Sequence, residues 1–148
     1  MISIKFIVCD ITQFKTLDIC YKHNNSCTKS DTYSFIVTTN LKKSGAINFL
    51  DDKKRVLFHF NPRPSKVKEN NVEVIGGIIV MNTWNRFWGV EERIKLPTSQ
   101  PSEPLLFRLF VDFESIAVYL HQTDVLLHTY KHRLPWSTLK STKIDHGW

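Results

Sequence analysis

The chain has 148 residues, the size of one domain, and can bury a hydrophobic core large enough to need neither a disulfide nor a metal for stability. Hydrophobic residues make up 42% of the sequence and charged residues 23%, which excludes a disordered or collagen-like protein. With 20 Lys and Arg against 14 Asp and Glu, the formal net charge is +6. The basic residues are spread out, and the densest runs, 52–55 and 131–133, are as short as solvated turns, so we expect no nucleic-acid binding.

Residues 1–33 are the segment that is hardest to interpret. The three cysteines of the chain are Cys9, Cys20 and Cys27. An odd count at irregular spacing favours reduced thiols made in the cytosol over a disulfide framework, and without a CxxC pair beside His23 we expect no metal. The apolar stretch at the start is short and interrupted by charges, and no apolar run reaches the roughly 18 residues of a membrane helix. We therefore expect a cytoplasmic protein that does not insert into membranes, and any export to proceed without a signal peptide.

Short strands dominate the rest of the chain. In 105–113, Phe107, Leu109, Val111 and Phe113 alternate with residues such as Arg108, which predicts a strand with these four side chains on one face. Similar strand patterns cover 56–61, 73–81, 116–120 and 125–129. Turn residues stand at 70–71, 82–85, 97–104 and 122–124. Because no segment keeps a helical period, we predict an all-β protein, an antiparallel two-sheet β-sandwich.

A row of polar residues occupies one of these strands. His59, Asn61 and Arg63 lie two residues apart, so they share one face of the strand, while Phe58 and Phe60 point to the core. A ring nitrogen, an amide and a guanidinium in a row suit the recognition of hydroxyl groups, which both donate and accept hydrogen bonds.

A second group of residues follows the next strand. Asn82 stands at the end of that strand, before a turn, and Gly89 permits a tight bend after Trp88. Glu91 and Arg93 share a face of the following strand and can hold each other while still offering groups to a ligand. An exposed indole suits the C–H face of a pyranose. Together with the polar row, these residues predict a site for a neutral sugar.

These two groups, with the later segment 130–135, resemble the carbohydrate-recognition signature of the galectins, and the resemblance extends over about residues 34–145. It implies a jelly-roll carbohydrate-recognition domain at 34–148, preceded by an atypical N-terminal segment, 1–33, with some strand. It also implies a non-catalytic lectin without cofactors. Its partners would be β-galactosides such as lactose and N-acetyllactosamine, carried on glycoproteins or glycolipids.

The resemblance also assigns roles to individual residues. The implied sugar-binding residues are His59, Asn61, Arg63, Asn82, Trp88, Glu91 and Arg93. The first three would contact the axial hydroxyl of galactose, and Asn82 and Glu91 would hold its exocyclic hydroxyl. Trp88 would stack on the ring, while Glu91 and Arg93 would reach the next sugar, glucose or N-acetylglucosamine.

The sequence departs from the galectin pattern in several places. Proline replaces the usual glycine within 97–104, and two large residues, Trp84 and Phe87, stand in a loop that is usually polar, where they would narrow or extend the sugar groove. The galectin pattern has one more strand than this sequence, which ends at Trp148. The loss of that strand would expose a sheet edge. Residues 1–33 or a second copy of the chain, forming a homodimer, would then cover the edge.

Two other functional classes compete with a lectin. A glycosidase needs two carboxylates flanking the scissile bond, whereas Glu91 and Glu92 are adjacent and face opposite ways, so we expect no enzyme. The competing hypothesis is a galectin-like interaction module that binds a protein, or an acidic partner through its basic surface. Residues expected to serve only packing or structure are Trp84, Trp136, Trp148, His132 and Arg133.

Overall fold

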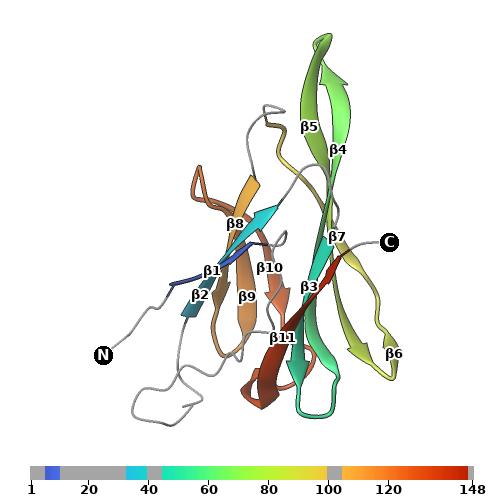
Figure 1. The fold of residues 1–148 in the computed structure, drawn as a ribbon, viewed down its shortest axis with the longest axis vertical. Helices are drawn as coiled ribbons and strands as arrows, with labels where there is room; N and C mark the ends of the chain where they lie inside the picture. The colour runs from blue at the N-terminus through green and yellow to red at the C-terminus, as the bar shows by residue number, and fades with distance from the viewer. Residues whose placement is uncertain (1–5, 11–32, 40–44, 100–104, 147–148) are drawn as a thin grey trace.

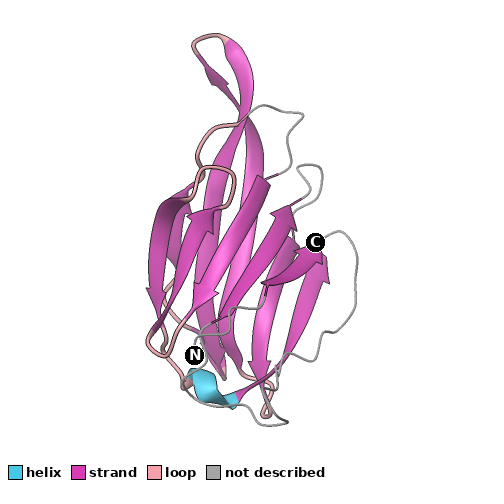
Figure 2. Cartoon of the chain, turned by 90° about the vertical axis from the view of Figure 1, so that its left-hand side faces the viewer, coloured by secondary structure: helices cyan, strands magenta, loops and turns pink. Residues whose placement is uncertain are grey.

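The computed structural model describes residues 6–10, 33–39, 45–99 and 105–146, which form two β-sheets packed face to face (Figures 1 and 2). This confirms the predicted all-β sandwich. Within these ranges the helical content is one short 3-10 helix, η1 (Trp136–Thr138). No helix in the described part of the chain has the length and apolar character needed to cross a membrane.

One sheet has five strands in the order β1-β2-β8-β9-β10. Their bounds are β1 Phe6–Asp10, β2 Tyr33–Thr39, β8 Leu105–Val111, β9 Ser115–Leu120 and β10 Val125–Lys131. The pairing of β1 with β2 is parallel, and every other strand pair among the described residues is antiparallel. A strand from the N-terminal segment therefore forms an edge of this sheet.

The other sheet has the order β11-β3-β4-β5-β6, and a further strand, β7, also pairs with β5. Their bounds are β3 Gly45–Asp51, β4 Val56–Glu69, β5 Val72–Asn85, β6 Phe87–Trp88, β7 Glu92–Lys95 and β11 Leu139–His146. The long strands β4 and β5 extend beyond the rest of the sandwich as a hairpin at the top of Figure 1. Asn70 and Asn71 close it, and their φ angles of 50° and 65° are those of a two-residue hairpin turn.

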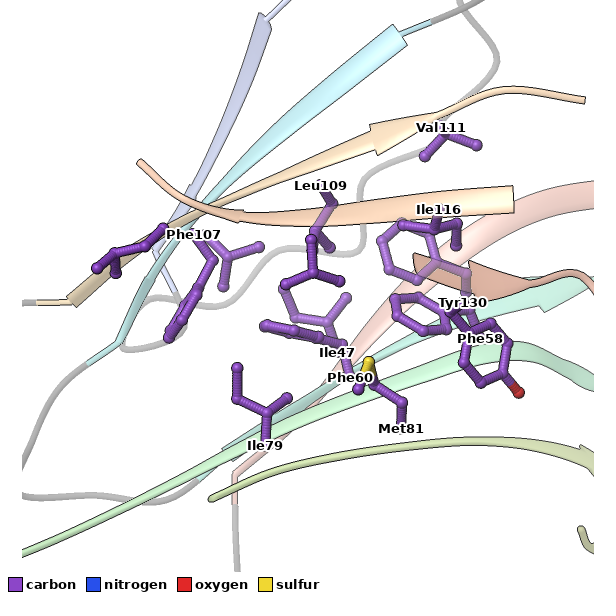
Figure 3. Close-up of a cluster of buried hydrophobic side chains, with 14 of the residues drawn as sticks. Ile47, Phe58, Phe60, Ile79, Met81, Phe107, Leu109, Val111, Ile116 and Tyr130 are labelled. Carbon is purple, nitrogen blue, oxygen red and sulfur yellow. The ribbon is translucent and has the colours of Figure 1, made fainter. Parts of the chain in front are cut away.

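The core lies between the two sheets (Figure 3). Phe58 and Phe60 of β4 are fully buried, as their alternation with His59 predicts. From the opposite sheet, Phe107 meets Phe60 edge-on with ring centroids 5.5 Å apart. Tyr130 of β10 packs 4.8 Å from the ring of Phe58.

Three predictions from the sequence need correction. Phe113 lies beyond the end of β8 and is 73% exposed, because the chain already turns at Asp112, whose carboxylate accepts from the backbone N–H of Glu114 and Ser115. The strand predicted at 125–129 contains a register shift between Leu126 and His128, so its alternation fails there. The strands predicted at 56–61 and 73–81 run to 56–69 and 72–85.

Strand β11 was not predicted from the sequence, yet it pairs with β3 along seven positions, from Leu139 to His146. Trp136, just before it, is buried, as expected. Cys20, Cys27, His23 and Trp148 lie outside the described residues.

Candidate functional site

All seven residues singled out from the sequence lie on the six-stranded sheet or on the loop between β6 and β7. Strand register brings them together in rows. His59 of β4 pairs with Asn82 of β5. In the next row, Asn61 pairs with Val80, which pairs with Arg93 of β7. Paired residues point to the same face of a sheet, so these side chains share the face opposite the core, which we call the outer face.

The three residues of the polar row on β4 differ in exposure. His59 is partly buried, Asn61 is 7% exposed and Arg63 is exposed. Desolvation by burial lowers the pKa of His59, and nearby Arg63 lowers it further, against an opposing effect of Asp145 and Glu91. The His59 ring is therefore neutral at pH 7 and keeps one nitrogen lone pair for accepting a hydrogen bond.

Trp88 stands beside this row. Its side chain is 51% exposed, and its indole meets the His59 ring edge-on, with ring centroids 4.9 Å apart. Trp84 pairs with Trp88 in register and is partly buried, whereas Phe87 is 75% exposed. The indole is thus placed as an open platform next to hydrogen-bonding groups.

Asn82 holds the start of the loop that follows Trp88. Its Nδ2 donates to the Gly89 carbonyl oxygen (2.9 Å), and its Oδ1 accepts from the backbone N–H of Thr83 (2.8 Å). The Gly89 N–H in turn donates to the Thr83 carbonyl oxygen (3.0 Å). Asn82 is only 3% exposed, so its most evident role is to fix the loop.

Arg133, which the sequence predicts to be structural, holds the same loop from a position just after β10. Its Nη1 donates to Asn82 Oδ1 (3.0 Å) and its Nη2 to Glu92 Oε2 (2.8 Å). A Cβ on Gly89 would lie 2.9 Å from Arg133 Nη1 and 3.2 Å from Asn82 Oδ1, so a side chain at this position would push against the hydrogen bond that joins these two residues.

Glu92 of β7 joins the two sheets through a hydrogen bond to His128 of β10. Its Oε1 lies 2.9 Å from His128 Nε2 of β10, and since a carboxylate only accepts, that nitrogen carries the proton. Burial acts to raise the pKa of Glu92, but the hydrogen bonds from His128 and Arg133 outweigh it, and the pKa lies below its ordinary value. His128 had no signal in the sequence, because its partner lies 36 residues away.

Glu91 and Arg93 form an ion pair, as their spacing suggested. Arg93 Nε donates to Glu91 Oε2 at 2.7 Å, and Arg93 Nη2 lies 2.5 Å from the same oxygen. Both side chains are exposed, so the pair contributes little to stability, but its remaining donors and acceptors stay available. Within the described ranges, no three His, Cys, Asp or Glu residues are grouped to hold a metal ion.

We expect Arg133→Ala to weaken binding of the predicted sugar ligand about tenfold. The substitution removes the hydrogen bonds from Arg133 to Asn82 and to Glu92, and the loop next to Trp88 is then held less firmly. Arg108→Ala is the matched control. Both arginines pair with a carboxylate and lie over a tyrosine ring: Arg133 with Glu92 and Tyr130, and Arg108 with Asp124 and Tyr119. Arg108 belongs to the other sheet. Isothermal titration calorimetry would compare the two. Equal loss in both variants, or none in Arg133→Ala, would contradict this role of Arg133.

Comparison with known proteins places this arrangement in context. The profile of a family described as galactoside-binding lectin matches residues 27–148. Among solved structures, the chain is similar to sheep galectin-11 in complex with glycerol, with 17% identity, a TM-score of 0.58, and 88% of this chain and 86% of that chain covered. It is also similar to toad ovary galectin in complex with thio-digalactose (17% identity, TM-score 0.55, 76% and 79% covered).

A third similar structure is Xenopus laevis galectin-Ib, with 23% identity, a TM-score of 0.51, and 70% of this chain and 73% of that chain covered. At these identities the structural likeness speaks for the fold alone. No curated protein matches the sequence significantly.

Proposed function

Because the chain belongs to the galactoside-binding lectin family, a family of non-catalytic carbohydrate-binding proteins, we propose that it binds β-galactosides such as lactose and N-acetyllactosamine on the outer face of its six-stranded sheet. The ligands in the cell would be glycans carried on glycoproteins or glycolipids. Toad ovary galectin, which has the same fold, was solved with thio-digalactose, which supports this choice of sugar.

The observation that carries the proposal is the exposed Trp88 indole 4.9 Å from the His59 ring, at one end of the polar row on β4. A galactose ring stacked on the indole would bury its C–H face and turn its axial hydroxyl toward the row. There the neutral His59 accepts a hydrogen bond, Arg63 donates, and the Asn61 amide does both. In this proposal, Glu91 and Arg93 would contact the second sugar.

Retention on lactose-agarose tests the proposal directly. We expect the protein to bind the resin and to elute with free lactose, in low and in moderate salt alike, because the ligand is neutral and no counterions are released. Failure to bind would contradict the proposal. Binding to an acidic polymer that falls steeply with salt, without lactose retention, would instead favour an interaction module acting through the basic surface.

The pH dependence follows from His59. Burial holds the pKa of its ring below the ordinary value for histidine, so the ring is neutral at pH 7 and above, and lactose affinity should be constant there. As the pH falls through the lowered pKa, the ring gains a proton, loses its lone pair and can no longer accept from a hydroxyl, so affinity should fall. Calorimetric titrations across this range measure the effect. His59→Gln, which cannot titrate, should bind lactose weakly, and its affinity should not fall in acid. A wild-type affinity that rises in acid would contradict the role of His59.

A further inference from the structure

Behind His59, away from Trp88, two side chains form a chain of hydrogen bonds that ends at the edge of the sheet. Asn48 of β3 pairs with His59 in register, and its Oδ1 lies 2.6 Å from His59 Nδ1. The other end of the same amide, Nδ2, donates to Asp145 Oδ2 of β11 at 2.6 Å. Asn48 is only 6% exposed, and a buried amide needs a hydrogen-bond partner at each end. His59 and Asp145 are these two partners.

The carboxylate fixes the direction of the whole chain. An ionised carboxylate only accepts, so the amide must turn its NH₂ group toward Asp145 and its oxygen toward His59. An amide oxygen also only accepts, and His59 Nδ1 must therefore carry a proton. In a neutral ring this leaves Nε2 without one. The direction follows from charge and valence, whichever way the amide is first drawn.

We propose that Asp145, acting through Asn48, holds His59 in the tautomer with the proton on Nδ1, so that Nε2 is always ready to accept a hydrogen bond from a sugar hydroxyl. Asp145 and Asn48 are positioning residues, since they reach the ligand only through His59. The inference rests on the proposed sugar binding for its purpose, but the tautomer itself is a property of the free protein.

Other charged groups near His59 do not set its tautomer. Arg63 and Glu91 act on the ring through their charges, and neither makes a hydrogen bond to it. Lys143 Nζ lies 3.6 Å from Asp145 Oδ1 and is largely exposed, whereas Asn48 donates to the other carboxylate oxygen, Oδ2. Trp88 contributes an edge-on ring contact and no charge. The directional hydrogen bond comes from Asn48.

The test uses Asp145→Asn, which keeps the shape but removes the charge. The new amide can donate to Asn48, which frees Asn48 to turn its NH₂ group toward His59 and lets the tautomer with the proton on Nε2 form. We expect ¹⁵N NMR of the imidazole, recorded without sugar, to show one bare nitrogen, Nε2, in the wild type and a mixture in Asp145→Asn. Lactose affinity should fall about threefold to tenfold.

Two further variants separate this idea from a general effect. Lys143→Gln removes the other partner of Asp145 and should leave both tautomer and affinity unchanged. The exchange Asn48→Asp with Asp145→Asn places the carboxylate against His59, where it again accepts from Nδ1, and should restore the single tautomer.

The outcomes are distinguishable from those of the proposed function. A bare Nδ1 in the wild type, an unchanged tautomer in Asp145→Asn, or no restoration by the exchange would overturn the positioning role even if lactose binds normally. If the wild type shows a bare Nε2 but binds no lactose, sugar binding fails while the tautomer control stands.

Discussion

Replacing Trp88 with alanine should abolish detectable lactose binding and leave the fold intact. A disaccharide on the open face of a sheet makes few contacts, so its total binding free energy is about 4–6 kcal/mol, equivalent to dissociation constants from millimolar to tens of micromolar. The indole offers the large apolar contact and shields the neighbouring hydroxyl bonds from water. Losing such an anchor costs about 2 kcal/mol or more, which moves binding beyond ordinary detection.

The same substitution should change the free energy of unfolding by under about 0.5 kcal/mol, because half of the Trp88 side chain is already exposed to solvent. Phe87→Ala is the matched control: the neighbouring residue is also aromatic and is more exposed, at 75%, but it alternates to the other face of β6. It should bind lactose nearly as well as the wild type. If Trp88→Ala binds at wild-type strength, or if it unfolds, the platform role is wrong.

The second large effect concerns Trp136. This residue of η1 is 8% exposed, its ring lies 5.4 Å from that of Phe49, and it stacks on His132 with centroids 4.9 Å apart and planes 19° apart. Trp136→Ala would leave a cavity at the end of the sandwich, and we expect the free energy of unfolding to fall by about 3–5 kcal/mol.

Urea denaturation followed by circular dichroism would measure this loss, and the pair of tryptophan variants should show opposite behaviour. Trp136→Ala should still bind lactose wherever it remains folded, whereas Trp88→Ala should be stable and fail to bind. A change of less than about 1 kcal/mol for Trp136→Ala would show that the site collapses around the cavity or that this tryptophan is not part of the core.

Period-two alternation made much of the fold predictable. Phe58 and Phe60 are buried and His59 lies between them on the outer face, because successive side chains of a strand point to opposite faces of the sheet. Phe113 misled the same reasoning, since the strand ends at Val111 and a side chain beyond it is free of the alternation. Strand β11 has a weak pattern, and what makes it a strand is its pairing with β3, a contact about 90 residues away in the sequence.

In the candidate site, the residues that face the ligand could be predicted from the sequence, whereas the residues that hold them could not. The residues expected to face the ligand lie within two motifs, and register alone brings His59 opposite Asn82. The residues that hold them come from distant strands: Arg133 from the end of β10 and Asp145 from β11. A single sequence carries no signal for contacts such as the one between Asn48 and Asp145, which spans 97 positions. These supports could be found only once the strands were placed.

The most direct test of the central claim is calorimetric titration of the protein with lactose and, in parallel, with cellobiose. The two disaccharides differ only in the hydroxyl at carbon 4 of the non-reducing sugar, which is axial in lactose and equatorial in cellobiose. We predict saturable lactose binding, with a dissociation constant between about 10 μM and 1 mM, and no measurable binding of cellobiose. Equal binding of both sugars, or of neither, would contradict a β-galactoside site built on His59, Asn61 and Trp88.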